Sequence, residues 1–207
     1  MKLRYILMVA IIFSSANLSA AKKLDDLIGS KNKSSIDLEE TFGKDKKTSV
    51  RQITIAGAFG FALGAKFNPA AVGARPGKNA FSYFINPAKK FRNWNNYMVD
   101  ITPITGKIYQ ISAVYFFKDE LEMNREKEIV LALLREKYSE SIGEGRVAAE
   151  EYFYYRNENT GRFVVLTVQR QDEFKGLMLM YTDKKLADLA QQEQLKIEKT
   201  QSNSELL

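Results

Sequence analysis

The 207-residue chain contains no cysteine and no histidine. Without cysteine it cannot form a disulfide, a thiolate nucleophile, an iron–sulfur cluster or a cysteine-type zinc site. Without histidine it lacks the commonest general base and the commonest ligand of transition metals. Most familiar catalytic centres are therefore excluded, and the sequence predicts neither a metal site nor a cofactor.

Long hydrophobic runs are scarce, and the clearest lies at the N-terminus. Residues Tyr5 to Phe13 are continuously apolar, follow the cations Lys2 and Arg4, and precede small residues ending in Ala20. A membrane-spanning helix needs roughly 20 apolar residues, about twice this run. The pattern is typical of a secretory signal peptide over residues 1–20, with an uncleaved anchor as the alternative. The sequence thus predicts a periplasmic or secreted protein.

The positive charge of the chain is modest. Removal of Lys2 and Arg4 with the leader would lower the formal charge from +6 to +4. Such a surplus favours contact with anionic polymers or lipid headgroups without requiring it. Peripheral contact with a membrane is compatible with it, whereas the absence of a clustered basic helix argues against nucleic acid as a partner.

The polar, lysine-rich stretch at residues 21–49 is predicted to be a flexible arm, although a short helix beginning near Ser35 is an alternative. The ordered domain is expected at residues 50–183. A C-terminal helix and tail are expected at residues 184–207, with Asp183 as the helix cap.

Alternating apolar residues dominate the central part of the chain. A clear hairpin is predicted from residues 97–101 and 108–117, joined by a turn containing Pro103 and Gly106. Because the later predicted strands are also joined by short turns, they should pair antiparallel. The fold class expected is α+β, with a single antiparallel meander-like sheet of six or seven strands packed on one main helix. The further predicted strands are residues 50–56, 79–85, 151–156, 162–170 and 175–181.

The main helix is predicted at residues 124–139. Asn124 can cap its start, and glycines at 143 and 145 end it. The apolar stripe expected to face the sheet comprises Ile129, Val130, Leu133, Leu134 and Tyr138.

The glycine-rich stretch from Gly57 to Phe67 matches neither a dinucleotide-binding motif nor a phosphate-binding loop. Its main interpretation is a tight turn where backbone segments approach closely. The alternative is a small groove lined by Phe59, Phe61 and Phe67.

Several short motifs of the sequence resemble those of small exported proteins of Gram-negative bacteria that are generally labelled uncharacterised. They are Phe59-Gly60-x3-Gly64, Asn86-Pro87, Phe91, the run from Tyr97 to Ile111 and the stretch Leu133 to Tyr138. The resemblance covers roughly residues 53–138. It implies a periplasmic α+β domain and carries over no catalytic residue.

Two segments are candidates for binding. Lys89, Lys90, Arg92 and Trp94 combine cations with an aromatic ring, a mixture that can seat an anionic group or an acidic partner. In the alternative interpretation Trp94 and Phe91 fill the core while the cations stay in water.

The second candidate is the aromatic run that contains Tyr152 and Tyr154, which an open sheet face would expose for recognition. In its alternative interpretation these tyrosines form a second layer that the C-terminal helix covers.

Carboxylates offer no obvious catalytic pair. The adjacent Glu150 and Glu151 should point to opposite faces of a strand, and Asp119, Glu120 and Glu122 are expected in a solvated linker. The leading hypothesis is a non-catalytic binding module that recognises an envelope protein or an anionic polymer, for example an inhibitor or immunity protein. The alternatives are a carboxylate-dependent hydrolase of cell-wall material and a lipid-interacting envelope accessory protein.

Overall fold

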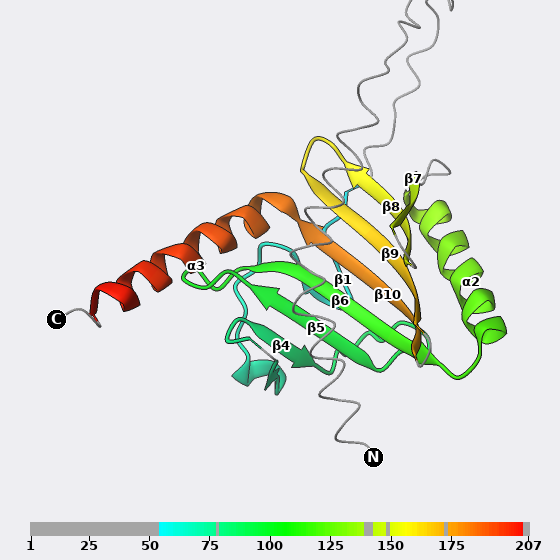
Figure 1. The fold of residues 1–207 in the computed structure, drawn as a ribbon, viewed down its shortest axis with the longest axis horizontal. Helices are drawn as coiled ribbons and strands as arrows, with labels where there is room; N and C mark the ends of the chain where they lie inside the picture. Colours follow the sequence, from blue (N-terminus) through cyan, green and yellow to red (C-terminus); the bar gives the residue numbers. More distant parts are fainter. Residues whose placement is uncertain (1–53, 78, 139–142, 148–149, 172–173, 205–207) are drawn as a thin grey trace, which may run out of the picture. The chain divides into compact units, whose positions relative to one another are not determined.

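A computed structural model describes residues 54–77, 79–138, 143–147, 150–171 and 174–204. The predicted signal peptide and flexible arm lie outside the described residues. The dominant feature is an eight-stranded antiparallel sheet in the order β3-β4-β5-β6-β10-β9-β8-β7, with helices α2 and α3 (Figure 1). Its strands are β3 (Arg75–Pro76), β4 (Ser82–Ile85), β5 (Asn96–Ile101), β6 (Ile108–Phe117), β7 (Gly143–Val147), β8 (Glu150–Asn157), β9 (Arg162–Gln171) and β10 (Phe174–Asp183).

The predicted α+β class is confirmed, and the sheet has more strands than the six or seven expected. Two meanders build it: β3 to β6 from one side and β7 to β10 from the other, meeting where β6 pairs with β10. Short turns give antiparallel neighbours within each meander. Helix α2 makes the one long connection, from β6 to the far edge strand β7.

The β5–β6 hairpin follows its predicted bounds closely. Asp100 pairs with Gln110 and Ile101 with Ile108, so Tyr109 is an extra residue that forms a bulge. The turn between the strands is closed by backbone bonds from Gly106 N–H to the Thr102 carbonyl (3.0 Å) and from Thr102 N–H to the Lys107 carbonyl (2.9 Å).

The main helix, α2 (Glu120–Tyr138), begins four residues before the predicted start. Asp119 is its cap, since the Asp119 carboxylate accepts the Glu122 N–H at 2.8 Å. The expectation of Asn124 as cap and of a linker before it was therefore wrong, although Asp119, Glu120 and Glu122 are exposed as expected. Glu120 and Glu122 instead lie in the first turn, where acidic side chains favour the helix dipole.

The face that α2 buries also differs from the predicted stripe. Val130, Leu134 and Tyr138 are buried as expected, together with Met123 and Leu131. Leu133 is 43% exposed and Ile129 is 39% exposed, so these two lie on the outer face. Within the continuous apolar run at residues 129–134, every direction around the helix is apolar, so this run alone does not define which side faces the sheet.

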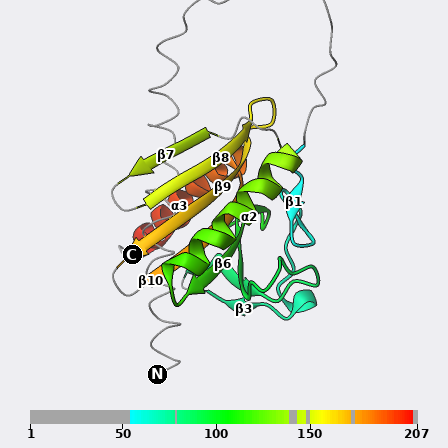
Figure 2. The ribbon, with the colours of Figure 1, turned by 90° about the vertical axis from the view of Figure 1, so that its right-hand side faces the viewer.

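Helix α2 lies against one face of the sheet, here called the α2 face (Figure 2). Side chains of the α2 face alternate along each strand with those of the opposite face. Both sets contain buried residues, so β10 is buried on both sides, which fits its central position in the sheet. On β10 the α2 face carries Leu177, Leu179 and Tyr181, and the opposite face carries Met178, Met180 and Thr182.

A small hairpin, β1 (Gly57–Ala58) and β2 (Phe61–Ala62), packs against the core of the α2 face. Its tip residues, Phe59 and Gly60, both have positive φ (55° and 91°). A Cβ on Gly57 would lie 2.1 Å from the Phe61 carbonyl oxygen, so only glycine allows the two strands to come this close. The segment therefore forms the tight turn predicted for it. A predicted strand at 50–56 is not found in its described part, residues 54–56, which has no regular structure.

Helix α3 (Lys184–Ser204) directly follows β10 and is capped by Asp183, as predicted. Its first half contacts β6 and β10, and its second half extends away from the sheet (Figure 1). The described residues belong to one compact unit of the chain, residues 53–207. Among the helices described, none is long and apolar enough to cross a membrane.

Candidate functional site

The loop at residues 86–95 joins β4 to β5 and carries the predicted cations. A tight turn forms its centre, where Trp94 N–H donates to the Phe91 carbonyl at 3.0 Å. Within that turn Arg92 has a φ of +48°, a conformation that non-glycine residues rarely adopt. The Tyr97 hydroxyl accepts the Phe91 N–H at 2.8 Å and donates to the Trp94 carbonyl at 3.0 Å. The Tyr97 hydroxyl thus fixes the loop backbone through two hydrogen bonds.

Trp94 lies in the core, with 1% of its surface exposed. Its indole Nε1 donates to the Glu126 Oε1 atom on α2 at 3.0 Å. The ring meets Phe91 edge-on at 5.3 Å between centroids and stacks on Tyr115 at 6.3 Å. This ring therefore cannot face a partner, and its role is to fasten the loop to α2 and the sheet.

The cations of the loop lie at the surface. Lys89 and Lys90 are exposed, and within the described chain neither forms an ion pair. The Arg92 side chain is 43% exposed, and its Nε donates to Glu126 Oε1 at 2.9 Å. Glu126 consequently binds both Arg92 and Trp94, which couples an exposed cation to a buried ring. The result is a fixed loop that presents positive charge, here called the basic loop (residues 89–92).

Tyr152 and Tyr154 lie elsewhere, on β8 and on the face opposite α2. The Tyr152 ring is 7% exposed, and its hydroxyl donates to the Glu150 carboxylate. Burial, together with that bond and the negative charge of Glu150, raises the pKa of Tyr152 well above its ordinary value. The Tyr154 ring lies against Gly143 of β7, where an added Cβ would come within 2.5 Å of it.

These tyrosines are not brought together with the basic loop, because three strands, β6, β10 and β9, separate β5 from β8. Their neighbours Phe153 and Tyr155 point to the α2 face instead. There Tyr155 stacks on Tyr138 at 5.2 Å, and Lys127 lies 5.7 Å above the Phe153 ring. The aromatic run therefore divides between the two faces of the sheet.

A buried polar chain that the sequence reasoning missed crosses the opposite face of the sheet. Asp100 is 2% exposed and accepts hydrogen bonds from the Ser82 hydroxyl and from Gln110 Nε2 (2.8 Å). Gln110 Oε1 in turn accepts from the Thr182 hydroxyl at 3.4 Å. Four adjacent strands supply these residues in one row. The available signal was an acid placed inside the apolar run of β5, at residue 100.

Burial raises the pKa of Asp100 to about 6, although the bonds from Ser82 and Gln110 act in the other direction. Burial also raises the pKa of Tyr109 in the adjacent bulge, and the negative charge of Asp100 adds to that rise. An acid with a pKa near 6 can act in proton transfer. Here, however, both carboxylate oxygens are engaged and almost no surface is exposed.

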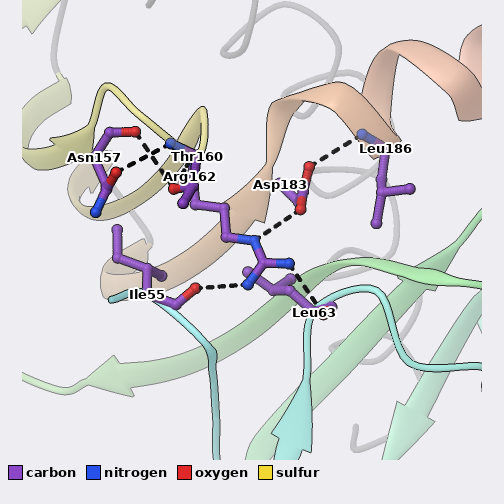
Figure 3. A network of polar contacts seen from close by, with 7 residues as sticks. All are labelled: Ile55, Leu63, Asn157, Thr160, Arg162, Asp183 and Leu186. Atoms are coloured by element: carbon purple, nitrogen blue, oxygen red, sulfur yellow. Dashed lines mark hydrogen bonds and ion pairs between the residues drawn. The ribbon is translucent and has the colours of Figure 1, made fainter. Parts of the chain in front are cut away.

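A second polar network fastens the first described segment to the sheet (Figure 3). Arg162 on β9 pairs with Asp183 through Nε at 2.8 Å, and its other nitrogens donate to the Ile55 carbonyl (3.0 Å) and the Leu63 carbonyl (3.3 Å). The other Asp183 oxygen accepts the Leu186 N–H at 3.2 Å and thereby caps α3. All of these contacts are internal to the fold, so the network is structural.

A third buried carboxylate, after Asp100 and Asp183, also forms hydrogen bonds that hold parts of the fold together. Glu193 on α3 is 3% exposed, and its Oε2 accepts the backbone N–H groups of Ile104 (2.6 Å) and Thr105 (3.1 Å). These contacts dock α3 on the β5–β6 turn.

The other candidates from the sequence were the carboxylates and the glycine-rich segment. In the part of the chain that the structure describes, no group of three or more acidic side chains is placed to hold a metal ion. Glu150 and Glu151 point to opposite faces, as expected of neighbours in a strand. Gly64 faces Arg162 and Leu186, while the space beside Gly60 is open.

Comparison of the chain with protein-family models, with curated proteins and with solved structures found no match.

Proposed function

We propose that this protein is an exported, non-catalytic binding module that recognises an anionic partner in the cell envelope through the basic loop. The observation that carries the proposal is the contrast within that loop. Lys89 and Lys90 are exposed, while the backbone beside them is held by Tyr97 and by the contact of Trp94 with Glu126. A loop fixed before binding loses little conformational entropy on binding, so its charges act at low cost.

The Arg92 guanidinium adds directed hydrogen-bond donors to the positive charge of Lys89 and Lys90. Glu126 engages its Nε, and among the described residues the two terminal nitrogens form no hydrogen bond. A guanidinium edge of this kind matches the two oxygens of a phosphate or carboxylate. The partner that best fits is therefore a polymer or protein surface bearing phosphate or carboxylate groups.

Binding to purified anionic envelope polysaccharide and to vesicles of anionic phospholipid tests the proposal. The double variant K89A/K90A should bind about 10- to 30-fold more weakly, since each lysine near an anionic surface contributes about 1 kcal/mol. The matched control, K196A/K199A, removes the same charge from the exposed end of α3 and should bind like the wild type. Equal losses in both variants would reduce the effect to net charge and contradict a site at the loop.

Export is the part of the proposal that rests on sequence alone. The leader at residues 1–20 has the charged, apolar and small-residue order of a signal peptide. N-terminal sequencing of protein recovered from fractionated cells should start near Ala21 in the envelope fraction. Recovery of the intact leader in the cytosol would contradict export without affecting the binding test.

A carboxylate-dependent hydrolase remains the second candidate, and Asp100 is the observation that favours it. Its raised pKa suits a general acid, but a substrate would have to reach a side chain that is 2% exposed. Turnover of cell-wall fragments by the purified chain, abolished in D100N while binding to anionic polymer persists, would replace the binding module with an enzyme.

A further inference from the structure

The two edges of the main sheet differ in their ability to accept another strand. At one edge β3 has two residues, and the second is Pro76, which has no N–H to donate. At the other edge β7 has five residues without proline, and among the described elements only β8 pairs with it. Alternate residues of such an edge direct their N–H and C=O groups outward, where a further strand can pair with them.

The residues of β7 are arranged so that the charge alternates on one face. Gly143 and Gly145 pair with Tyr154 and Tyr152, on the face opposite α2. Glu144 pairs with Phe153 and Arg146 with Glu151, so the register assigns both positions to the α2 side of the strand. The Glu144 side chain is exposed. A partner strand would therefore meet one negative and one positive position, two residues apart.

We propose that the occupant of this edge is the β7 strand of a second copy of the chain, paired antiparallel about a two-fold axis through Gly145. A two-fold axis that makes neighbouring strands antiparallel stands perpendicular to the sheet and keeps each face continuous. In this register Glu144 of each copy lies opposite Arg146 of the other, and all five residues are paired. Opposite charges on directly facing positions stabilise a strand pair.

The other registers that keep the faces continuous pair fewer residues and oppose like charges. A shift in one direction opposes Glu144 to its own copy, and a shift in the other opposes Arg146 to its own copy. Each shift also leaves three residues paired instead of five. Like charges facing each other destabilise a pair, so the sequence of β7 selects one register and disfavours its neighbours.

The arrangement of the helices leaves room for this pairing. The backbone of α2 runs over β6 and β10, and β9 and β8 lie between it and the edge. With strands about 4.8 Å apart, the α2 helices of the two copies would be roughly 38 Å apart. The basic loop lies at the other end of the strand order, between β4 and β5, so this assembly goes beyond the proposed function and leaves that site open.

Charge-reversal variants of Glu144 and Arg146 test the proposal, with the molecular mass in solution as the measurement. The mature wild-type chain should show concentration-dependent dimerisation by sedimentation or light scattering. E144R places arginine at both positions and R146E places glutamate at both, so each variant alone should be monomeric. Mixing E144R with R146E should restore the dimer, because every facing pair then has opposite signs. The double exchange E144R/R146E should dimerise like the wild type.

Two controls keep the test decisive. R75E changes the charge at the other edge and should leave dimerisation unchanged, while the far-UV circular dichroism and melting temperature of each variant establish that it folds. If both single variants fail to fold, E144Q, which removes the charge that would face Arg146 of the second copy from an exposed side chain, should weaken dimerisation instead. A monomeric wild type at all concentrations, or single variants that dimerise as well as the wild type, would overturn the proposal.

Discussion

The two faces of the main sheet are built from the same strands but are stabilised by different interactions. On the α2 face, Leu177, Leu179 and Leu166 are buried with the helix and with aromatic rings. On the opposite face, Met178 and Met180 lie beside the polar row that includes Asp100. Burial of apolar surface is insensitive to pH, whereas a buried carboxyl must lose its proton at a cost. The faces should therefore respond differently to truncation and to pH.

The largest effect is expected from removing Trp94, which joins the basic loop to the α2 face. W94A should lower the free energy of unfolding by about 3–5 kcal/mol, because a large buried ring leaves a cavity. Chemical denaturation followed by circular dichroism measures it. R92A, its matched control, removes only a half-exposed ion pair with Glu126 and should cost no more than about 1 kcal/mol. Similar small losses in both variants would mean that Trp94 is not core.

The orientation of α2 can be tested by two leucines two residues apart. L131A should cost about 2–5 kcal/mol because Leu131 is 2% exposed against the α2 face. L133A should change the free energy of unfolding by no more than about 0.5 kcal/mol, since that side chain is 43% exposed. The opposite order of losses would rotate the helix to the face first expected from the sequence.

On the opposite face the test is pH. The pKa of Asp100 is about 6 in the folded chain, against an ordinary value of 3.8 in the unfolded chain, so the folded state holds this proton more tightly than the unfolded state. Its contribution to stability is then fully present below pH 3.8 and is lost as the pH rises through about 6. Because the pKa of Asp100 differs by about two between the folded and the unfolded chain, this contribution to the free energy of unfolding is roughly 3 kcal/mol.

The variant D100N isolates that contribution. Its amide does not ionise, so the difference in the free energy of unfolding between D100N and the wild type should move in favour of the variant as the pH rises from 4 to 7. Denaturation at a series of pH values measures the difference. A difference that stays constant with pH would show that Asp100 does not carry the titration.

The alternation of apolar residues made the strands predictable, and β6 begins and ends at the predicted residues. Edge strand β7 escaped prediction because Gly143 and Gly145 leave it without an apolar face. Its strand conformation depends on pairing with β8, which is not a local property. The short strands β1 and β2 likewise depend on contacts with the core, where Phe59 packs on Tyr97 at 5.0 Å.

The candidate site was predictable in composition and only partly in geometry. The cations Lys89 and Lys90 are exposed, but the buried indole of Trp94 has its hydrogen-bond partner in Glu126, which lies 32 residues away. Likewise, Asp100 meets Thr182 through Gln110 across three strands. Local patterns report which residues alternate, whereas these partners are set by the order of strands in the sheet.

The smallest effect distinguishes polar groups within the opposite face itself. The Thr167 hydroxyl is buried and has no hydrogen-bond partner among the described residues, while the Thr182 hydroxyl donates to Gln110. Valine keeps the shape of threonine and removes only the hydroxyl. T167V should therefore leave the free energy of unfolding unchanged or raise it slightly, because no bond is lost and an unpaired polar group is removed. T182V should lower it by about 1 kcal/mol, since the Gln110 oxygen then loses a donor in a buried site. Equal losses in the two variants, measured by denaturation at the same pH, would imply that Thr167 has a partner and that this face is more fully hydrogen-bonded than its row of side chains indicates.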